Sequence, residues 1–321
     1  MWTFGYNRKR LMNKRQAYLH ALAAIEKAAR GSHLHRLAFA PGRYLWGMLH
    51  SKLLYPVNGR SRRQQAPLFF GGVMEVLLPA GLDIYLLSAK SHDSEIRLAR
   101  FMALHLAKGM NMLDVGAHFG FFSRLGAALM EEEGRVLAVE AASSTYEVLQ
   151  RNIAGQPGIE GIRAAASDAE GTATFYEFPA LYSEYNTLEK GQFEDAAWKK
   201  DIHPKVTKVP AYRMDTLMEE QGLLAHFIKI DVEGAEAQVV AGLSNWFSSP
   251  NARWLAMEFL AAARHNESHR RANAHLAEHG WQPFSIQADG SLEPCPDIEA
   301  YLKNKGLDSD NIVFQPEGRP N

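Results

Sequence analysis

The chain has 321 residues, of which 46% are apolar and 22% are charged, so it can bury a large core. Its single cysteine, Cys295, excludes an intramolecular disulfide framework and a cysteine-rich zinc site. The N-terminus has no apolar signal sequence, and the longest apolar run, 68–87, is interrupted by Glu75 and Asp83. We therefore expect a cytoplasmic protein without a membrane span.

The net charge of −1 conceals an uneven distribution along the chain. Residues 1–66 contain 13 Lys and Arg against one acidic residue, whereas the rest contains 22 basic and 35 acidic residues. We predict a basic helical N-terminal extension over 1–66. It is either simply solvated or makes peripheral contact with anionic lipid at the inner membrane surface, with Trp2, Phe4, Trp46 and Tyr55 as anchors. No nucleic-acid-binding module is recognisable, so no nucleic acid partner is expected.

Helices and a small hairpin are expected before the main alternating pattern begins. The hairpin is predicted from two short apolar runs, 73–78 and 83–87, separated by Pro79-Ala80-Gly81. Basic and turn-forming residues over 56–65 predict a linker, and we place the domain boundary after residue 66. Apolar residues at helical spacing predict helices over 16–29, 44–54 and 95–107.

Strands and helices then alternate, which predicts a Rossmann-like α/β domain over 67–321. Right-handed crossovers make such a sheet doubly wound and mostly parallel, and we expect seven strands with an antiparallel hairpin at one edge. An insertion over 179–204 carries aromatic residues, and we expect it to form the wall of the site against which the acceptor substrate lies; we call it the acceptor wall. The expected strands cover 111–115, 135–140, 161–166, 172–178, 206–212, 227–230, 254–259, 282–287 and 311–314. The expected helices cover 121–130, 145–154, 215–221, 235–243 and 268–279.

The first strand of this domain ends in a turn with two glycines. Gly116 permits a tight turn and close approach of a ligand to the backbone, and Gly120 permits close packing where the next helix begins. This G-x-x-x-G spacing differs from the G-x-G-x-x-G that holds a pyrophosphate. Asp114 would repel a phosphate, but it suits the ammonium and sulfonium groups of S-adenosylmethionine. The expected cofactor-binding turn is Met112-Leu113-Asp114-Val115-Gly116-Ala117-His118-Phe119-Gly120.

Two later strand ends add further cofactor-binding residues. Glu140, followed by Ala141, stands 24 residues after Gly116, where an acid can accept hydrogen bonds from ribose hydroxyls. Ser167 and Asp168 would lie over an adenine ring, unless Asp168 only starts a turn. Because a ribose-binding acid also suits NAD, an NAD-dependent oxidoreductase is an alternative, and a catalytically silent scaffold that binds the cofactor is another.

The most distinctive strand end carries three acidic residues after the apolar run 227–230. Clustered carboxylates repel one another, so they usually serve a cation, a metal or a proton transfer. Asp231 is expected to face the methyl donor or to act as general base, Glu233 points towards the next loop, and Glu236 complements the helix dipole. A divalent cation at Asp231 and Glu233 is the less favoured alternative, so we predict no metal ligand.

Several other polar residues are weaker candidates. His203 is a candidate base for a substrate hydroxyl, and Glu258 stands at another strand end. Glu95 is placed near the amino-acid end of the cofactor, and His118 either faces the cofactor or is simply exposed. The insertion offers aromatic and polar side chains for contact with a sugar: Tyr182, Tyr185, Asn186, Phe193 and Trp198.

Together these motifs resemble the FkbM-type methyltransferases, a branch of the Rossmann-like S-adenosylmethionine-dependent enzymes. The motifs that carry the resemblance are 113–120, 139–140, 166–171 and 228–236, of which the last is the most specific. The chain departs from the family at His118, where Asn is commoner, and at Ala141, where Pro is commoner. The resemblance implies O-methyl transfer from S-adenosylmethionine, with S-adenosylhomocysteine as product, to a sugar, glycolipid or natural-product hydroxyl. It leaves the acceptor and the oligomeric state open.

Overall fold

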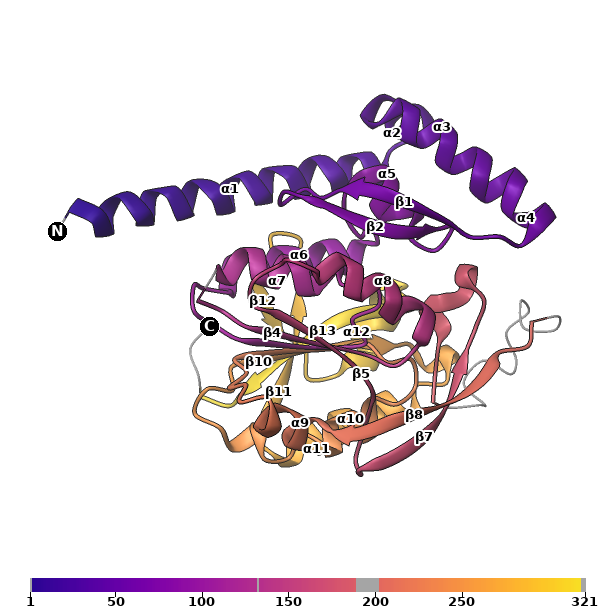
Figure 1. Ribbon diagram of the computed structural model, residues 1–321. Coiled ribbons are helices and arrows are strands. Elements are labelled where there is room, and N and C mark those ends of the chain that lie inside the picture. The colour runs from indigo at the N-terminus through magenta and orange to yellow at the C-terminus, as the bar shows by residue number, and fades with distance from the viewer. Residues whose placement is uncertain (1, 132, 189–201, 319–321) are drawn as a thin grey trace.

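The computed structural model describes residues 2–131, 133–188 and 202–318 and is built around one large twisted sheet (Figure 1). The sheet has eight strands in the order β12-β11-β13-β10-β9-β3-β4-β5. The five strands from β10 to β5 run parallel, whereas β13, β11 and β12 are antiparallel to their neighbours. The strands are β3 (Met112–Val115), β4 (Val136–Glu140), β5 (Ile159–Arg163), β9 (Phe227–Ile230), β10 (Trp254–Leu260), β11 (Trp281–Ile286), β12 (Leu292–Pro294) and β13 (Ser309–Pro316).

This architecture confirms the Rossmann-like prediction and changes two details. The sheet gains an eighth strand because β12, which has only three residues, pairs along β11. The expected antiparallel hairpin is present, but β13 lies between β11 and β10 instead of at the edge. A helix that the sequence did not predict, α12 (Ile298–Lys305), connects β12 to β13.

Helices cover both faces of the parallel strands. Figure 1 shows α6, α7 and α8 above the sheet and α9, α10 and α11 below it. Every residue of β3 and β9 is consequently buried, which explains why both strands are mostly apolar, with one charged residue each, Asp114 and Lys229. The helices are α6 (Asp93–His105), α7 (Phe121–Met130), α8 (Ser143–Ile153), α9 (Met214–Glu220), α10 (Glu236–Ala241) and α11 (Glu267–Glu278).

A second, three-stranded sheet accompanies the main one. The expected strand over 161–166 is divided between β5 and β6 (Ala165–Ser167), and β6 pairs with β8 (Lys205–Arg213), which also pairs with β7 (Gly171–Glu177). The short 3-10 helix η2 (Ala180–Tyr185) follows β7. The expected acceptor wall is thus described over 179–188 and 202–204, and Phe193 and Trp198 lie outside the described residues.

The N-terminal layer is helical, as predicted, but its details differ. It contains α1 (Trp2–Arg30), α2 (His33–Phe39), α3 (Pro41–Leu49), the π-helix η1 (His50–Leu54), α4 (Tyr55–Asn58), β1 (Arg62–Pro67), β2 (Val73–Leu78) and α5 (Leu82–Leu87). The linker expected at 56–65 is wrong, because its second half pairs with β2 as β1. The hairpin expected from 73–78 and 83–87 is also wrong, because the second run forms α5. Short apolar runs do not distinguish a strand from a buried helix.

One hydrophobic core joins the N-terminal layer to the sheet domain. Leu22 and Ile25 of α1 belong to the same buried cluster as Phe101 of α6 and Leu125 of α7. Within the N-terminal layer, the Tyr18 hydroxyl donates a hydrogen bond of 2.9 Å to the carbonyl oxygen of Phe70, between β1 and β2. Within the described residues, no helix has both the length and the apolarity that a membrane crossing requires.

Candidate active site

A cavity of about 710 Å³ lies at the carboxyl ends of β3, β4, β9 and β10. Ligands of doubly wound sheets bind outside these strand ends, and the volume falls in the range of small-molecule sites. The turns after the strands form its floor, and α5, the start of α6 and η2 form walls. Ala29 and Arg36 of the N-terminal layer also line it, so that layer contributes to the site.

Gly116 brings two strand ends into direct contact. Its φ is +78°, and a Cβ atom there would lie 1.8 Å from the carbonyl oxygen of Asp231. Gly120, with φ +87°, would place a Cβ 2.6 Å from the Leu149 Cδ1 atom. Both positions therefore require glycine, as the sequence predicts. Gly116, Ala117, His118 and Phe119 line the cavity.

Lys229 forms an ion-pair chain beneath this floor. Its ammonium donates to Asp231 Oδ2 at 3.0 Å and lies 3.8 Å from Asp114 Oδ1. Burial lowers the pKa of Lys229, but the two carboxylates outweigh this effect and the pKa is raised. Burial likewise raises the pKa of Asp231, but Lys229 outweighs it and the pKa is lowered, so Asp231 is ionised.

Asp114 is a partner of Lys229 and is not among the residues that line the cavity. It is fully buried, and its Oδ2 accepts a 2.5 Å hydrogen bond from the Ser123 hydroxyl. Burial raises the pKa of Asp114, against the opposing effect of Lys229. Asp114 therefore acts on the cavity through Lys229 and Asp231, whereas the sequence suggested direct contact with the cofactor.

Glu140 has its carboxylate fixed by three donors. Oε1 accepts from the Ala142 amide at 2.9 Å and the Thr145 hydroxyl at 2.8 Å, and Oε2 accepts from the His118 amide at 2.8 Å. Burial raises the pKa of Glu140, and the hydrogen bonds oppose that rise. Each carboxylate oxygen offers about two lone-pair sites, so Oε2 can still accept a bond from a ligand. Glu140 and Ala141 line the cavity.

A polar cluster that the sequence did not reveal joins α6 to η2. Lys90 lies 3.2 Å from Glu95 Oε1 and 2.6 Å from Glu184 Oε1. His118 Nε2 lies 3.0 Å from the Ser183 hydroxyl. Burial and the Lys90 ammonium lower the pKa of His118 to about 4, so its imidazole is neutral. The cluster closes the cavity beside the glycine turn, and Glu95 lines it as predicted.

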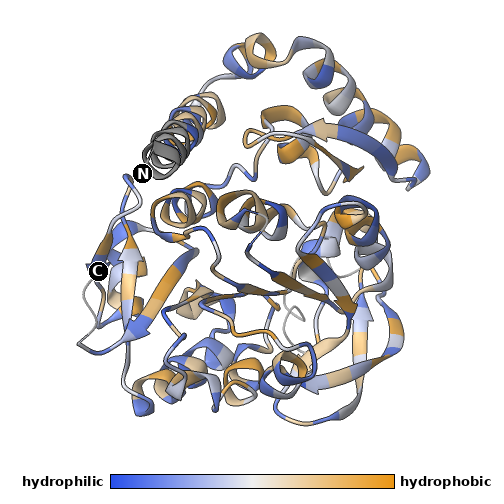
Figure 2. Cartoon of the chain, turned by 60° about the vertical axis from the view of Figure 1, so that its left-hand side comes forward, coloured by the Kyte–Doolittle hydropathy of each residue, from blue (hydrophilic) through white to orange (hydrophobic). Residues whose placement is uncertain are grey.

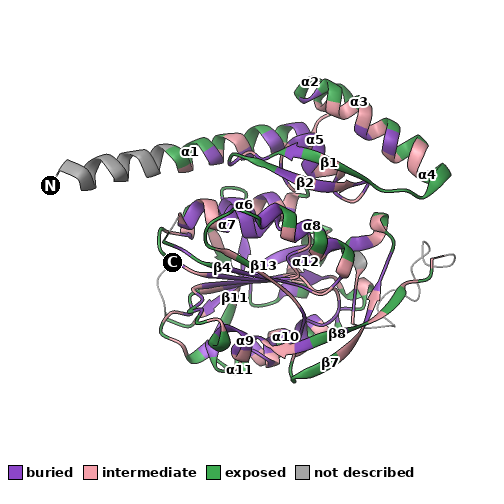
Figure 3. Cartoon of the chain, viewed as in Figure 1, coloured by how far each residue is buried: buried purple, intermediate pink, exposed green. Residues whose placement is uncertain are grey.

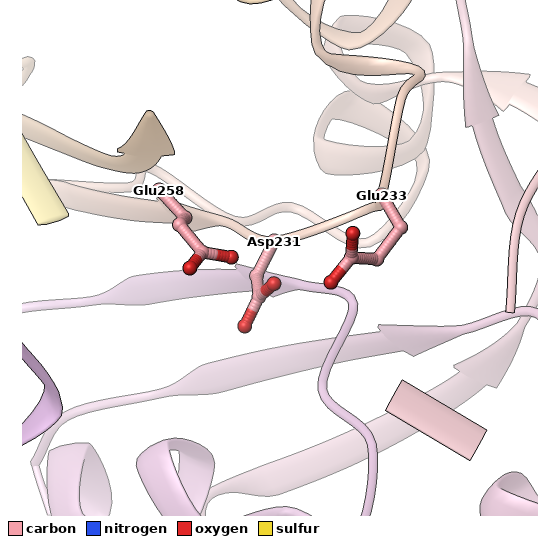
Figure 4. A group of neighbouring side chains, drawn as sticks. All are labelled: Asp231, Glu233 and Glu258. Atoms are coloured by element: carbon pink, nitrogen blue, oxygen red, sulfur yellow. The ribbon is translucent and has the colours of Figure 1, made fainter. Parts of the chain in front are cut away.

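Three carboxylates converge on the opposite part of the cavity. Figure 4 shows Glu258 of β10 beside Asp231 and Glu233, which follow β9. One oxygen from each lies within 4.8 Å of the others, close enough to hold a divalent cation. Burial and repulsion by Glu258 raise the pKa of Glu233 well above its usual value. Burial and repulsion by Asp231 raise the pKa of Glu258 to about 7.

Glu236 belongs to the fold around this group. Its Oε1 accepts from the Gly234 amide at 3.0 Å and lies 3.4 Å from His269 Nε2. It thereby holds the turn in which Glu233 has a φ of +48°.

Three predicted residues lie elsewhere. His203 is exposed, and neither it nor Ser167 nor Asp168 is among the residues that line the cavity. Asp168 accepts from the Ser167 hydroxyl at 3.3 Å and is exposed in the turn after β6. The wall near β6 is instead apolar and consists of Ala164, Ala165, Ala166, Phe175 and Leu188.

Comparison with known proteins identifies the family of the chain. The sequence model of the Methyltransferase FkbM domain matches residues 114–283, which is more than half of the chain. The chain belongs to the FkbM methyltransferase family. It is an S-adenosylmethionine-dependent methyltransferase.

Individual relatives of this methyltransferase are distant. The methyltransferase sdnD of Sordaria araneosa is 26% identical over 220 residues, which cover 61% of this chain and 73% of sdnD. The fibrillarin pre-rRNA processing protein of Methanococcus jannaschii is 14% identical, with a TM-score of 0.40 over 71% of this chain and 76% of that one. The O-methyltransferase of Bacillus cereus in complex with S-adenosylhomocysteine is 12% identical, with a TM-score of 0.37 over 68% and 79%.

The cavity of the methyltransferase has the chemistry that its methyl donor requires. The backbone of Gly116 lines the cavity, a fixed carboxylate is present at Glu140, and an apolar wall runs along 164–166. These features suit a cofactor with a ribose, an adenine and a cationic sulfur. Lys90 and Glu184 were missed because no sequence motif surrounds them. Lys229 carried a signal, since lysine inside a buried strand is rare unless it is paired.

Proposed function

We propose that this enzyme transfers the methyl group of S-adenosylmethionine to a hydroxyl oxygen of a sugar, glycolipid or natural-product acceptor. The observation that supports this proposal is the carboxylate group of Asp231, Glu233 and Glu258 inside the cavity. An alcohol is a poor nucleophile until its proton is removed. A base beside the methyl donor is therefore the feature that O-methyl transfer needs.

Glu258 is the proposed base. Its pKa of about 7 leaves it partly ionised at neutral pH, which suits proton acceptance. Burial and repulsion by Glu258 raise the pKa of Glu233, which favours its protonated form and suits it to donate a hydrogen bond to the acceptor. His203, the base considered from sequence, is exposed outside the cavity lining.

The remaining residues of the site bind and orient the cofactor. In this proposal Glu140 accepts from the ribose hydroxyls, and ionised Asp231 faces the positive charge of the cofactor. When bound, S-adenosylmethionine supplies an electrophilic methyl group on a sulfonium. The methyl group would pass from the sulfonium to the acceptor oxygen and leave S-adenosylhomocysteine, and Glu258 would take the hydroxyl proton. Alignment and exclusion of water supply most of the remaining rate enhancement.

The variant Glu258→Gln tests this role. We expect kcat to fall by about 10²- to 10⁴-fold, the usual contribution of a general base, while S-adenosylhomocysteine still binds. In the parent enzyme kcat/KM should fall as pH decreases below about 7, because protonated Glu258 cannot accept a proton. A panel of glycans, glycolipids and small hydroxyl compounds with isotope-labelled cofactor provides the assay.

The matched control is Glu220→Gln, which changes an exposed glutamate at the end of α9 and should keep full activity. Unchanged kcat in Glu258→Gln would contradict the assignment of the base. Loss of activity with a chelator and recovery with Mg²⁺ would assign the three carboxylates to a cation instead. Labelling of a nitrogen or carbon atom of every accepted substrate would contradict O-methyl transfer itself.

A further inference from the structure

The outer face of the N-terminal helices carries an apolar row that no described residue covers. Leu45, Leu49, Leu53 and Val57 recur at every fourth position along α3, η1 and α4, with exposed fractions of 63%, 41%, 60% and 87%. Residues four apart on a helix are neighbours, so they form one stripe, which we call the apolar stripe. Figure 3 shows exposed residues along these helices. Contiguous exposed apolar surface commonly marks an interaction site.

The opposite face of the same helices is fixed to the protein. Gly47 packs so closely on α5 that a Cβ there would lie 2.8 Å from Leu82 Cδ1. Trp46 packs against the core, and the Tyr55 hydroxyl accepts from the Leu181 amide. The two expected anchors therefore face inwards, and the side chains of the other two, Trp2 and Phe4, lie outside the described part of the structure.

The basic residues beside the apolar stripe are available to an external partner. Lys52, Arg60 and Arg62 are exposed, and none of them forms an ion pair with any residue in the described ranges. By contrast, Arg30 and Arg63 are paired with carboxylates of the sheet domain. The extension as a whole has 13 basic residues and one acidic residue, so the surface is complementary to an anionic partner.

We infer that the apolar stripe is a docking surface for an anionic lipid bilayer. The four apolar side chains enter the boundary between headgroups and acyl chains, and Lys52, Arg60 and Arg62 contact lipid phosphates. Figure 2 shows apolar and polar residues side by side on these helices, which is the composition of an interfacial helix. Because α2 contributes Arg36 to the cavity lining, docking brings the active site beside the membrane.

Flotation of the full chain with vesicles tests the docking surface. One set of vesicles contains phosphatidylcholine alone, and the other contains about a quarter of phosphatidylglycerol. We expect recovery on the anionic vesicles and a loss of at least about tenfold in Leu49→Glu/Leu53→Glu, because both leucines leave the apolar boundary. Raising the salt from about 0.1 M to about 0.5 M should weaken binding, since it screens the phosphates.

Two further variants complete the test. Leu224→Glu changes a leucine that is 63% exposed in the loop before β9, and it should bind as the parent does. Lys52→Glu/Arg60→Glu/Arg62→Glu reverses the charge at these positions without altering the apolar stripe and should also lose binding. Equal recovery on both vesicle types, or full binding of the leucine variant, would overturn the proposal. Absence of vesicle binding, with a dimer that the leucine variant dissociates, would assign the stripe to a second copy of the chain.

Discussion

At the scale of single residues, the sequence identified charged side chains of the site but not the side chains with which they pair. Asp114 was predicted to meet the cofactor because its carboxylate suits the positive charges of S-adenosylmethionine. Successive side chains of a strand point to opposite faces, and Asp114 points towards Ser123 of α7. Lys229 of the neighbouring strand then lies between Asp114 and Asp231. The pattern of residues along the sequence locates the end of a strand, whereas the face of the sheet to which a side chain points depends on packing in three dimensions.

The glycine turn was predictable because its requirement is local. Gly116→Ala should destabilise the fold by about 3 kcal/mol or more and abolish binding of S-adenosylhomocysteine, since the added methyl group would collide with the carbonyl of Asp231. Urea unfolding and calorimetric titration measure the two effects. Gly155→Ala is the matched control, because Gly155 has a similar φ of +71° but open space around it. That variant should cost only about 1–2 kcal/mol for the left-handed backbone. Equal costs for the two substitutions would show that the close contact is unimportant.

At the scale of elements, the sequence predicted the alternating region well and the N-terminal third poorly. Strands β3, β4 and β9 are mostly apolar, and glycine-containing turns follow β3 and β9, so the pattern of apolar residues and the turn residues point to the same strands. In contrast, 83–87 forms a helix that is buried on several sides. Its apolar residues therefore do not alternate with polar ones at a spacing that would identify a helix. The strand β1 is polar and exposed at most positions, so only its pairing with β2 makes it a strand.

The element η2 illustrates a contact that only the structure provides. Glu184 of η2 pairs with Lys90, and the neutral imidazole of His118 lies within hydrogen-bonding distance of Ser183. We expect Glu184→Gln to weaken binding of S-adenosylhomocysteine by about tenfold, the value of one charge-assisted hydrogen bond, with a small change in unfolding free energy. Isothermal titration and thermal unfolding measure these quantities. Glu133→Gln, which removes the exposed pair with Lys108, should change neither. Unaltered affinity in Glu184→Gln would mean that η2 does not help to close the cavity.

At the scale of the whole molecule, the basic N-terminal extension predicted from charge shares its core with the sheet domain. Burying α1 against α6 places the extension and the sheet domain in one hydrophobic cluster, even though the composition of the extension differs sharply from that of the rest, so we expect them to unfold together. The charge of a segment indicates which partners its surface attracts, whereas the spacing of its apolar residues indicates which face of a helix packs against the protein. The helix over 16–29 carried both signals, since Leu22 and Ile25 are buried and Lys27 is exposed.

This shared core makes a prediction about unfolding. Leu22 is fully buried in α1, so Leu22→Ala should lower the free energy of unfolding by about 2–5 kcal/mol through the lost contacts and the cavity left behind. Because the cluster connects α1 to the helices on the sheet, circular dichroism and tryptophan fluorescence should report one transition that shifts as a whole. Leu45→Ala is the control: that leucine is 63% exposed, and its loss should change stability by no more than about 0.5 kcal/mol. If Leu22→Ala instead produced two transitions, with the later one unchanged from the parent, the extension would be an independent unit. The cavity lining that it contributes through Ala29 and Arg36 would then be separable from the fold of the catalytic domain.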